Sequence, residues 1–173
     1  MELQIRAPVV EDADDLGRVH VRAWQGAYRN GLMPDEYLDG LSIEERASMW
    51  REWLSATPRA RSARLVAEIG SGTVEGFAMI GPADDENPDE GELYAINVEP
   101  DYWGTGIGRA LLQAATEALS ASQYKTAVLW VHPGNERARA FYEREGWQPD
   151  GIDREQEVLG VNVPETRYSK SVE

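Results

Sequence analysis

The sequence predicts an α/β fold: a single-domain, mixed and mostly antiparallel sheet with a central parallel β–α–β unit. The chain has 173 residues, about the length of one domain, and helical and strand periodicities alternate along it. A glycine-rich turn separates an apolar strand pattern at residues 93–98 from a helical pattern, and a second apolar strand pattern follows at residues 127–131. We therefore expect residues 1–173 to form one domain.

The N-terminal third predicts one strand and two helices. Leu3–Arg6 is a short strand candidate, and apolar residues recur at helical spacing over residues 11–25. A second helix is expected to begin at Ser42, because Glu45 follows three residues later in the pattern of a capping box. The connection between the two helices is rich in aromatic and turn residues.

The middle of the chain changes to the two-residue period of strands. Residues 64–69 and 74–80 predict an antiparallel hairpin joined by a turn at residues 70–73. Residues 82–91 hold five carboxylates and two prolines, which predicts a solvated loop between strands.

The strongest unit of the sequence follows this acidic loop. Residues 93–98 and 127–131 are apolar with little alternation, as expected of strands buried on both faces. Helical spacing from Ile107 onward fills the segment between them. Two strands joined by a helix predict a parallel pair with a right-handed crossover.

The C-terminal part predicts one more helix and two strands. Residues 135–145 are expected to be helical, with Gly146 ending the helix. Residues 158–163 and 167–171 are candidates for two final strands.

Composition excludes several classes of function. Seventeen basic against 31 acidic residues give a net charge of −14, which disfavours nucleic acid as a partner. High-salt tolerance, solubility and attraction of cationic substrates are alternative explanations of this charge.

The chain has no cysteine and only two distant histidines, His20 and His132, so no metal site is predicted. With no apolar run of about 20 residues and no signal-peptide pattern, we expect a cytoplasmic protein without a membrane partner.

The turn before the central helix has the composition of a phosphate cradle. Glycines stand at Gly104, Gly106 and Gly108, and Arg109 follows them. The free N–H groups of a helix N-terminus attract an anion, and glycine lets it approach closely. The spacing matches neither the dinucleotide fingerprint nor a P-loop. The alternative is a tight strand-to-helix turn whose glycines serve packing alone.

At this turn the sequence resembles the GNAT superfamily of N-acetyltransferases. Their cofactor motif is [Q/R]-x-x-G-x-[G/A], which Gly106 and Gly108 match, whereas Trp103 stands at the position of Gln or Arg. A second similar stretch, LWVHPGNERARAFYEREGW, carries Asn135 and Tyr142 at matching positions. Together with the N-terminal helices and the hairpin, the resemblance spans essentially the whole chain and implies a GNAT-like fold.

The resemblance implies that acetyl-CoA lies between the strands at residues 93–98 and 127–131. Pantetheine would pair with the first strand, and the pyrophosphate would rest on the glycine turn. The implied cofactor contacts are Ile96, Val98, Trp103, Gly104, Gly106, Gly108, Arg109 and Asn135. Arg137 and Arg139 have two interpretations, as contacts to CoA phosphates or as a solvated helix face that pairs with neighbouring glutamates.

Amide formation from a thioester needs a base for the ammonium and an acid for the thiolate. The family match and the chemistry of a phenol make Tyr142 the candidate proton donor. Glu92, which opens the strand leading to the cofactor, is the candidate base, although it could instead end the acidic surface loop. Tyr94, two residues farther on the same face, is the second candidate and is also expected near the substrate. An amine that binds already neutral would need no base.

The acceptor is expected near the first two helices. Trp24 and Tyr28 are the candidate acceptor contacts, because aromatic walls with carboxylates suit cationic amines. Without cysteine a thiol acyl-enzyme is impossible, so transfer would be direct. We therefore predict an N-acetyltransferase for a small cationic, polyamine-like primary amine, and a homodimer is an option that the family offers. The alternatives are a CoA-binding sensor without catalysis and an enzyme for peptide or protein amines.

Overall fold

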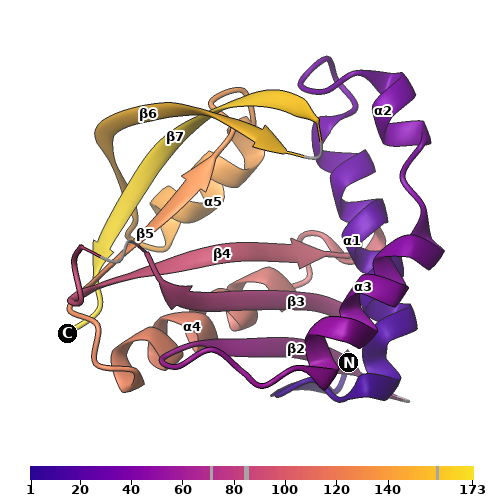
Figure 1. Ribbon diagram of the computed structural model, residues 1–173, viewed down its shortest axis with the longest axis horizontal. Coiled ribbons are helices and arrows are strands. Elements are labelled where there is room, and N and C mark those ends of the chain that lie inside the picture. The colour runs from indigo at the N-terminus through magenta and orange to yellow at the C-terminus, as the bar shows by residue number, and fades with distance from the viewer. Residues whose placement is uncertain (71, 84–85, 159) are drawn as a thin grey trace.

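One seven-stranded sheet organises the computed structural model, which describes residues 1–70, 72–83, 86–158 and 160–173 (Figure 1). Its strands are β1 (Leu3–Arg6), β2 (Ala63–Ile69), β3 (Thr73–Pro82), β4 (Glu90–Val98), β5 (Thr126–Val131), β6 (Gln148–Val158) and β7 (Val161–Ser171). Their order is β1-β2-β3-β4-β5-β7-β6, and among the described residues only β4 and β5 pair in parallel. The predicted mixed, mostly antiparallel fold class is confirmed.

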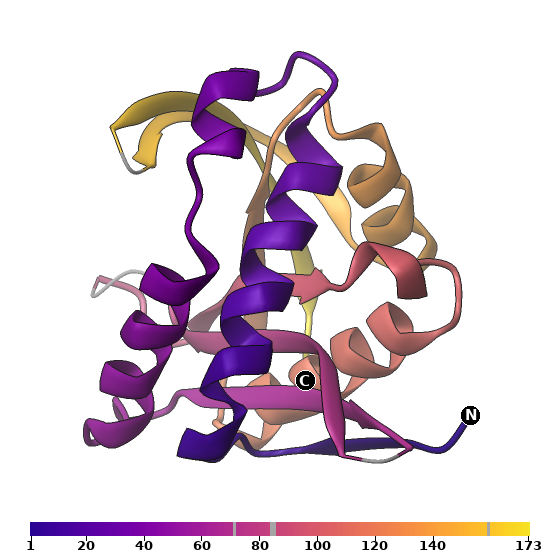
Figure 2. The same ribbon diagram turned by 90° about the vertical axis from the view of Figure 1, so that its right-hand side faces the viewer.

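Helices cover both faces of this sheet (Figure 2). They are α1 (Ala13–Tyr28), α2 (Asp35–Asp39), α3 (Ile43–Ser55), α4 (Ile107–Ala121) and α5 (Glu136–Arg144). The larger core lies under α4 and α5, where Leu111 and Trp147 are almost fully buried. The smaller core lies under α1 and α3 and is centred on Trp50 and Phe77. Burial of these apolar faces is the main stabilising contribution to the fold.

The N-terminal elements follow their local signals closely. The Ser42 hydroxyl accepts a hydrogen bond from the Glu45 backbone N–H at 3.1 Å, so the predicted start of α3 is confirmed. Helix α1 runs to Tyr28, three residues beyond the predicted end. The connection after it contains the short helix α2, which the turn-rich sequence did not indicate.

Strand β4 is bent by a bulge at the middle of the sheet. Leu93 pairs with Ile80 and Ala95 with Met79, so Tyr94 is the extra residue of β4. Bulges bend a strand and increase its twist. The parallel ladder to β5 covers only the first three residues of β4 and ends at Glu92, beyond which Figure 1 shows the two strands diverging.

This bend makes one prediction about β4 wrong. The strand was expected to be buried on both faces, yet Tyr94 is 40% exposed and residues 95–98 are only partly buried. The apolar composition remains necessary, because Ile96 and Val98 pack against the larger core from one side. Ile96 and Val98 also line a cavity, which lies where β5 would otherwise continue beside β4.

The two predicted C-terminal strands are also wrong in extent. The chain forms β6 from Gln148 to Val158 and β7 from Val161 to Ser171, so the break predicted between residues 163 and 167 does not exist and a strand before it was missed. The β6 sequence is polar and contains Pro149 and Gly151, which disfavour strands. Pairing with β7 along most of its length overrides this local preference.

Two predicted connections fall partly outside the described residues. Strand β3 continues through Pro82 and β4 begins at Glu90, so the acidic loop is shorter than residues 82–91. Within that loop, residues 84–85 lie outside the described part of the chain, as does residue 71 in the predicted turn at residues 70–73.

Candidate active site

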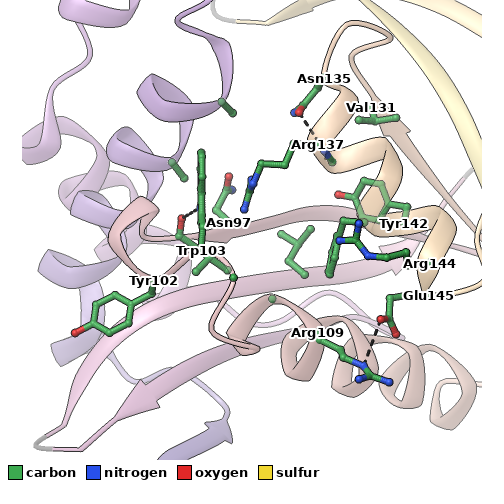
Figure 3. A pocket seen from close by; sticks show the side chains of 18 of the residues that line it. Asn97, Tyr102, Trp103, Arg109, Val131, Asn135, Arg137, Tyr142, Arg144 and Glu145 are labelled. Atoms are coloured by element: carbon green, nitrogen blue, oxygen red, sulfur yellow. Dashed lines mark hydrogen bonds and ion pairs between the residues drawn. The ribbon is translucent and has the colours of Figure 1, made fainter. Parts of the chain in front are cut away.

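A cavity of about 700 Å³ opens where β4 and β5 diverge (Figure 3). Its walls come from α1, β4, the turn before α4, β5 and α5. It is lined by Ala23, Ala27, Tyr28, Ile96, Asn97, Val98, Tyr102, Trp103, Gly104, Gly106, Gly108, Arg109, Val131, Asn135, Arg137, Ala138, Phe141, Tyr142, Arg144 and Glu145. The structure thus brings all eight residues expected to contact the cofactor, together with Tyr142, around one space.

The glycine turn forms one end of this cavity. Gly104 and Gly106 have φ of +77° and +94°, a left-handed backbone that favours glycine. A Cβ added at either position would meet nothing within 4 Å, so the space above the turn is open. Helix α4 starts directly after Gly106, and its first N–H groups lack helical partners. The turn therefore fits an anionic group such as a phosphate.

The charged rim of the cavity is basic although the protein is strongly acidic. Arg109, Arg137 and Arg144 line it, and Glu145 is the one carboxylate among the described lining residues. Arg109 and Glu145 form an ion pair at 3.3 Å, which leaves a positive balance. This local excess of cations complements a ligand that carries several phosphates.

Tyr142 lies on the buried side of α5, and Figure 3 shows its ring at the cavity. Its hydroxyl makes no hydrogen bond to any described residue, and burial raises the pKa of the phenol. Its neighbour Phe141 also lines the cavity. The Asn135 side chain accepts a hydrogen bond from the Ala138 N–H at 3.2 Å and so caps α5 at the cavity wall.

Glu92 stands at the last paired position of β4 and β5, where the two strands begin to separate. Its neighbours Gly91 and Leu93 face α4, so alternation turns the Glu92 side chain to the opposite face of the sheet. Burial raises its pKa to about 7; Glu165 and Glu90 add to this rise, while Arg154 opposes it. A carboxyl with such a pKa exchanges protons near neutral pH.

The candidate acceptor contacts lie in different places. Trp24 and Tyr28 stack edge to face on α1 with ring centroids 5.2 Å apart, and Tyr28 reaches the cavity. Tyr94 instead lies against β3: its hydroxyl donates to the Pro82 carbonyl, and a Cβ added at Gly81 would lie 2.7 Å from its ring. The structure therefore does not bring Tyr94 into the cavity.

Some lining residues could not be identified from sequence. Asn97 and Tyr102 flank the glycine turn without a motif of their own, and Arg144 lies near the end of α5. Of the two arginines considered together, Arg137 lines the cavity, whereas Arg139 donates to the Tyr168 hydroxyl at 3.0 Å and to a backbone carbonyl. Helical spacing alone does not tell which of these two arginines faces the cavity.

The described residues contain no candidate metal centre and no candidate membrane-spanning helix. No cluster of histidine, aspartate and glutamate there could hold a metal ion. In the same part of the chain, no helix is long and apolar enough to cross a membrane.

The divergent parallel strands, the open N–H cradle and the arginine rim define an acyl-CoA-dependent transferase as the class of protein. The chain belongs to the acetyltransferase (GNAT) family, whose sequence model matches residues 26–147. It is therefore an N-acetyltransferase that uses acetyl-CoA, as the resemblance in its sequence implied.

Individual relatives agree with this assignment. The chain is 31% identical over 163 residues to the uncharacterized N-acetyltransferase YuaI of Bacillus subtilis, covering 93% of this chain and 88% of that protein. It is 31% identical over 143 residues to a mycothiol acetyltransferase of Propionibacterium freudenreichii, covering 83% of this chain and 42% of the relative. In fold it is similar to the PaiA N-acetyltransferase of Thermoplasma acidophilum in complex with coenzyme A, with a TM-score of 0.75, 23% identity and 99% of each chain covered.

Proposed function

We propose that this enzyme transfers the acetyl group of acetyl-CoA directly to a primary amine of a small, cationic molecule. One observation carries the proposal. The unbonded Tyr142 hydroxyl lies at the cavity, and Glu92 stands where β4 and β5 part, so a proton donor and a proton acceptor flank the region where the strands diverge. Direct transfer also agrees with the absence of cysteine from the chain.

Each of these two groups has the protonation state that its role requires. Acetyl-CoA supplies the activated acyl thioester. Glu92, with a pKa raised to about 7 by burial, takes one proton from the acceptor ammonium, directly or through water, and the neutral amine then attacks and forms the C–N bond. The nitrogen loses its second proton to solvent as the tetrahedral intermediate collapses. Tyr142, whose pKa is raised by burial, is protonated at neutral pH and gives its proton to sulfur as the C–S bond breaks. The proton on Glu92 then returns to Tyr142 through solvent.

The charges around Glu92, on the face of the sheet opposite α4, support a cationic acceptor. Glu165 is close enough to raise the pKa of both Glu92 and Tyr28. Two cations lie here. Arg154 forms an ion pair with Glu165 at 3.0 Å and lies 3.9 Å from the centre of the Trp130 ring. Arg167 lies 5.9 Å from the same ring and forms an ion pair with Asp150 at 2.7 Å. Both guanidinium groups are already paired with a carboxylate, so the charge of Glu92 leaves a negative balance beside aromatic rings, which suits an amine that carries charge.

The packing of the C-terminal hairpin supports a small acceptor over a peptide. Val163 of β7 packs with Met33 and Leu38 in a third apolar cluster. In Figure 1 the hairpin of β6 and β7 reaches across to the α1–α2 connection. This contact encloses the acceptor side, whereas a protein substrate needs an open groove.

A thiol-release assay with acetyl-CoA tests the proposal. The enzyme is offered polyamines, amino acids, aminoglycosides and short peptides, and free CoA is measured; the protein adds no thiol background. We expect turnover with the polyamines. Turnover confined to peptides would overturn the small-molecule assignment. If acetyl-CoA raises the melting temperature but no amine reacts, a CoA-binding sensor becomes the better interpretation.

Matched substitutions separate chemistry from folding. Glu92→Gln is compared with Glu90→Gln, which alters a carboxylate two residues away on the same strand, one that lies 3.8 Å from Arg167. We expect Glu92→Gln to lower kcat by about 10²-fold, the usual contribution of a general base, and Glu90→Gln to change it little. Equal losses in both variants would indicate a general electrostatic effect instead of a base.

A further inference from the structure

Trp103 occupies the place where the family motif has Gln or Arg, and its own donor is already used. The indole Nε1–H donates to the Val98 carbonyl at 2.9 Å, within the turn. The side chain therefore offers no free donor and no charge to a phosphate beside Gly104. The ring nevertheless lines the cavity next to the glycine turn.

Arg137 supplies a charge at this same place from another element. It stands in the first turn of α5, and its guanidinium carbon lies 3.5 Å from the centre of the Trp103 ring. In Figure 3 the side chain extends from α5 across the cavity to the indole. Within the described part of the chain Arg137 has no carboxylate within ion-pair distance, so its charge is not neutralised by the protein.

The position of the indole is itself fixed by packing. A Cβ added at Gly26, inside α1, would lie 3.0 Å from the outer edge of the Trp103 ring and 3.1 Å from Pro100. Glycine is unfavourable inside a helix, but here its missing side chain makes room for the ring. Together with the bond to Val98, this contact holds the indole as a rigid platform.

A guanidinium that stacks flat on an aromatic ring keeps the N–H groups along its edge free to donate hydrogen bonds. Stacking occupies one face of the planar group, whereas its five N–H donors lie in the plane and stay available. The platform lies directly before Gly104 and Gly106, where the turn is open to an anion. The edge of Arg137 and the N–H groups of the turn thus converge on one anion position.

We propose that Trp103 and Arg137 together replace the single polar side chain of the family motif, with Trp103 positioning Arg137 to bind the pyrophosphate of CoA. Arg137 is then a cofactor-binding residue, and Trp103 is a positioning residue that acts through it. This inference rests on acetyl-CoA being the cosubstrate in the proposed function, but its test needs no acceptor amine.

The test measures binding of CoA, 3′-dephospho-CoA and pantetheine by calorimetry. Arg137→Gln should weaken binding of the first two ligands equally, by roughly 10- to 100-fold for a lost charge-assisted contact, and leave pantetheine unchanged. The control is Arg139→Gln, which removes a charge from the same helix outside the cavity. A penalty that disappears with 3′-dephospho-CoA would assign Arg137 to the 3′-phosphate and overturn the proposal. So would an equal penalty with pantetheine, which indicates a structural effect.

Two further variants test the action of Trp103 through Arg137. Trp103→Leu should weaken CoA binding, and adding Arg137→Gln to it should weaken binding less than Arg137→Gln does in the parent protein. Independent, additive effects would contradict the positioning role. The exchanged pair Trp103→Arg with Arg137→Gln should recover most of the parent affinity, because it restores the motif's own cation; no recovery would also count against the proposal. A parent protein that binds CoA but acetylates no amine would instead disprove the proposed function alone.

Discussion

Tyr28 of α1 and Tyr142 of α5 line the same cavity from two different helices. Burial raises the pKa of both phenols, to about 12 for Tyr28, and the presence of Tyr28 raises the pKa of Tyr142 further. Both are therefore protonated at neutral pH. Tyr142 belongs to the larger core, whereas the Tyr28 ring packs on Trp24 and lies 6.2 Å from His132, on the side proposed for the acceptor.

This difference in position predicts different kinetic effects. Tyr142→Phe should lower kcat by about 10²-fold, because it removes the proposed proton donor to the thiolate. Tyr28→Phe should act mainly on the KM for the amine. Steady-state kinetics with the reactive amine, together with melting temperatures of both variants, check this. A larger loss of kcat in Tyr28→Phe than in Tyr142→Phe would contradict this assignment of the two tyrosines.

The pKa of Glu92 predicts the pH dependence of the reaction. Since a base must be unprotonated, kcat/KM should rise with pH up to about 7, where Glu92 loses its proton. An alkyl ammonium titrates at about pH 10, so the two inflections are separable. In Glu92→Gln the inflection near neutral pH should vanish, whereas Glu90→Gln should keep it at a lower pH, because Glu90 helps to raise the pKa of Glu92. An unchanged profile in Glu92→Gln would exclude this carboxylate as the base.

The raised pKa of Glu92 also predicts how the stability of the folded protein changes with pH. Burial disfavours ionised Glu92 in the folded state, so the folded protein holds this proton more tightly than the unfolded chain, whose carboxyl titrates near 4.5. Its contribution to stability is largest below pH 4.5 and is lost as pH rises through 7. The melting temperature of Glu92→Gln relative to the parent should therefore increase from pH 5 to pH 8. A constant difference would mean that the folded-state pKa is not raised.

The glycine turn predicts two unlike effects of the same substitution. Gly106→Ala should destabilise the protein by about 1–2 kcal/mol, because alanine is strained in a left-handed backbone. Gly108 lies inside α4, and a Cβ there would make only ordinary contacts, the nearest at 3.6 Å to Phe141. Gly108→Ala should therefore stabilise the unliganded protein by about 0.5–1 kcal/mol, as alanine favours helices. Urea denaturation measures both, and equal destabilisation would contradict this account.

A buried ion-pair network anchors the strand end that leads into the turn. Glu99 is 3% exposed; it accepts hydrogen bonds from Arg18, at 2.8 Å, and from Arg22, while its own N–H donates to the Glu75 carbonyl at 2.8 Å. Glu99→Gln should lower the free energy of unfolding by roughly 1–3 kcal/mol, since it weakens charged hydrogen bonds. It should also weaken CoA binding, because the turn follows directly. Urea denaturation and calorimetry check this, with the exposed Glu117→Gln as control; loss of neither would show that the network is dispensable.

Local sequence was sufficient for the turns, caps and periodic elements. The cap at Ser42 and the left-handed turn at Gly104 and Gly106 depend on residues a few positions apart. The parallel unit around α4 could be predicted because each of its segments carries its own apolar pattern. For the same reason the expected cofactor contacts lie around one cavity: most of them belong to one continuous turn and the strand before it.

Contacts between distant segments decided the rest. Strand β6 exists although its sequence disfavours it, because β7 pairs with it. The bulge at Tyr94 follows from the register between β3 and β4, and it turns an apolar strand into a cavity wall. Arg137 and Arg139 are two residues apart on one helix, yet only packing sends the first to Trp103 and the second to Tyr168. A sequence pattern specifies which face of an element is apolar, whereas the partner of each polar side chain depends on which distant segment the fold brings beside it.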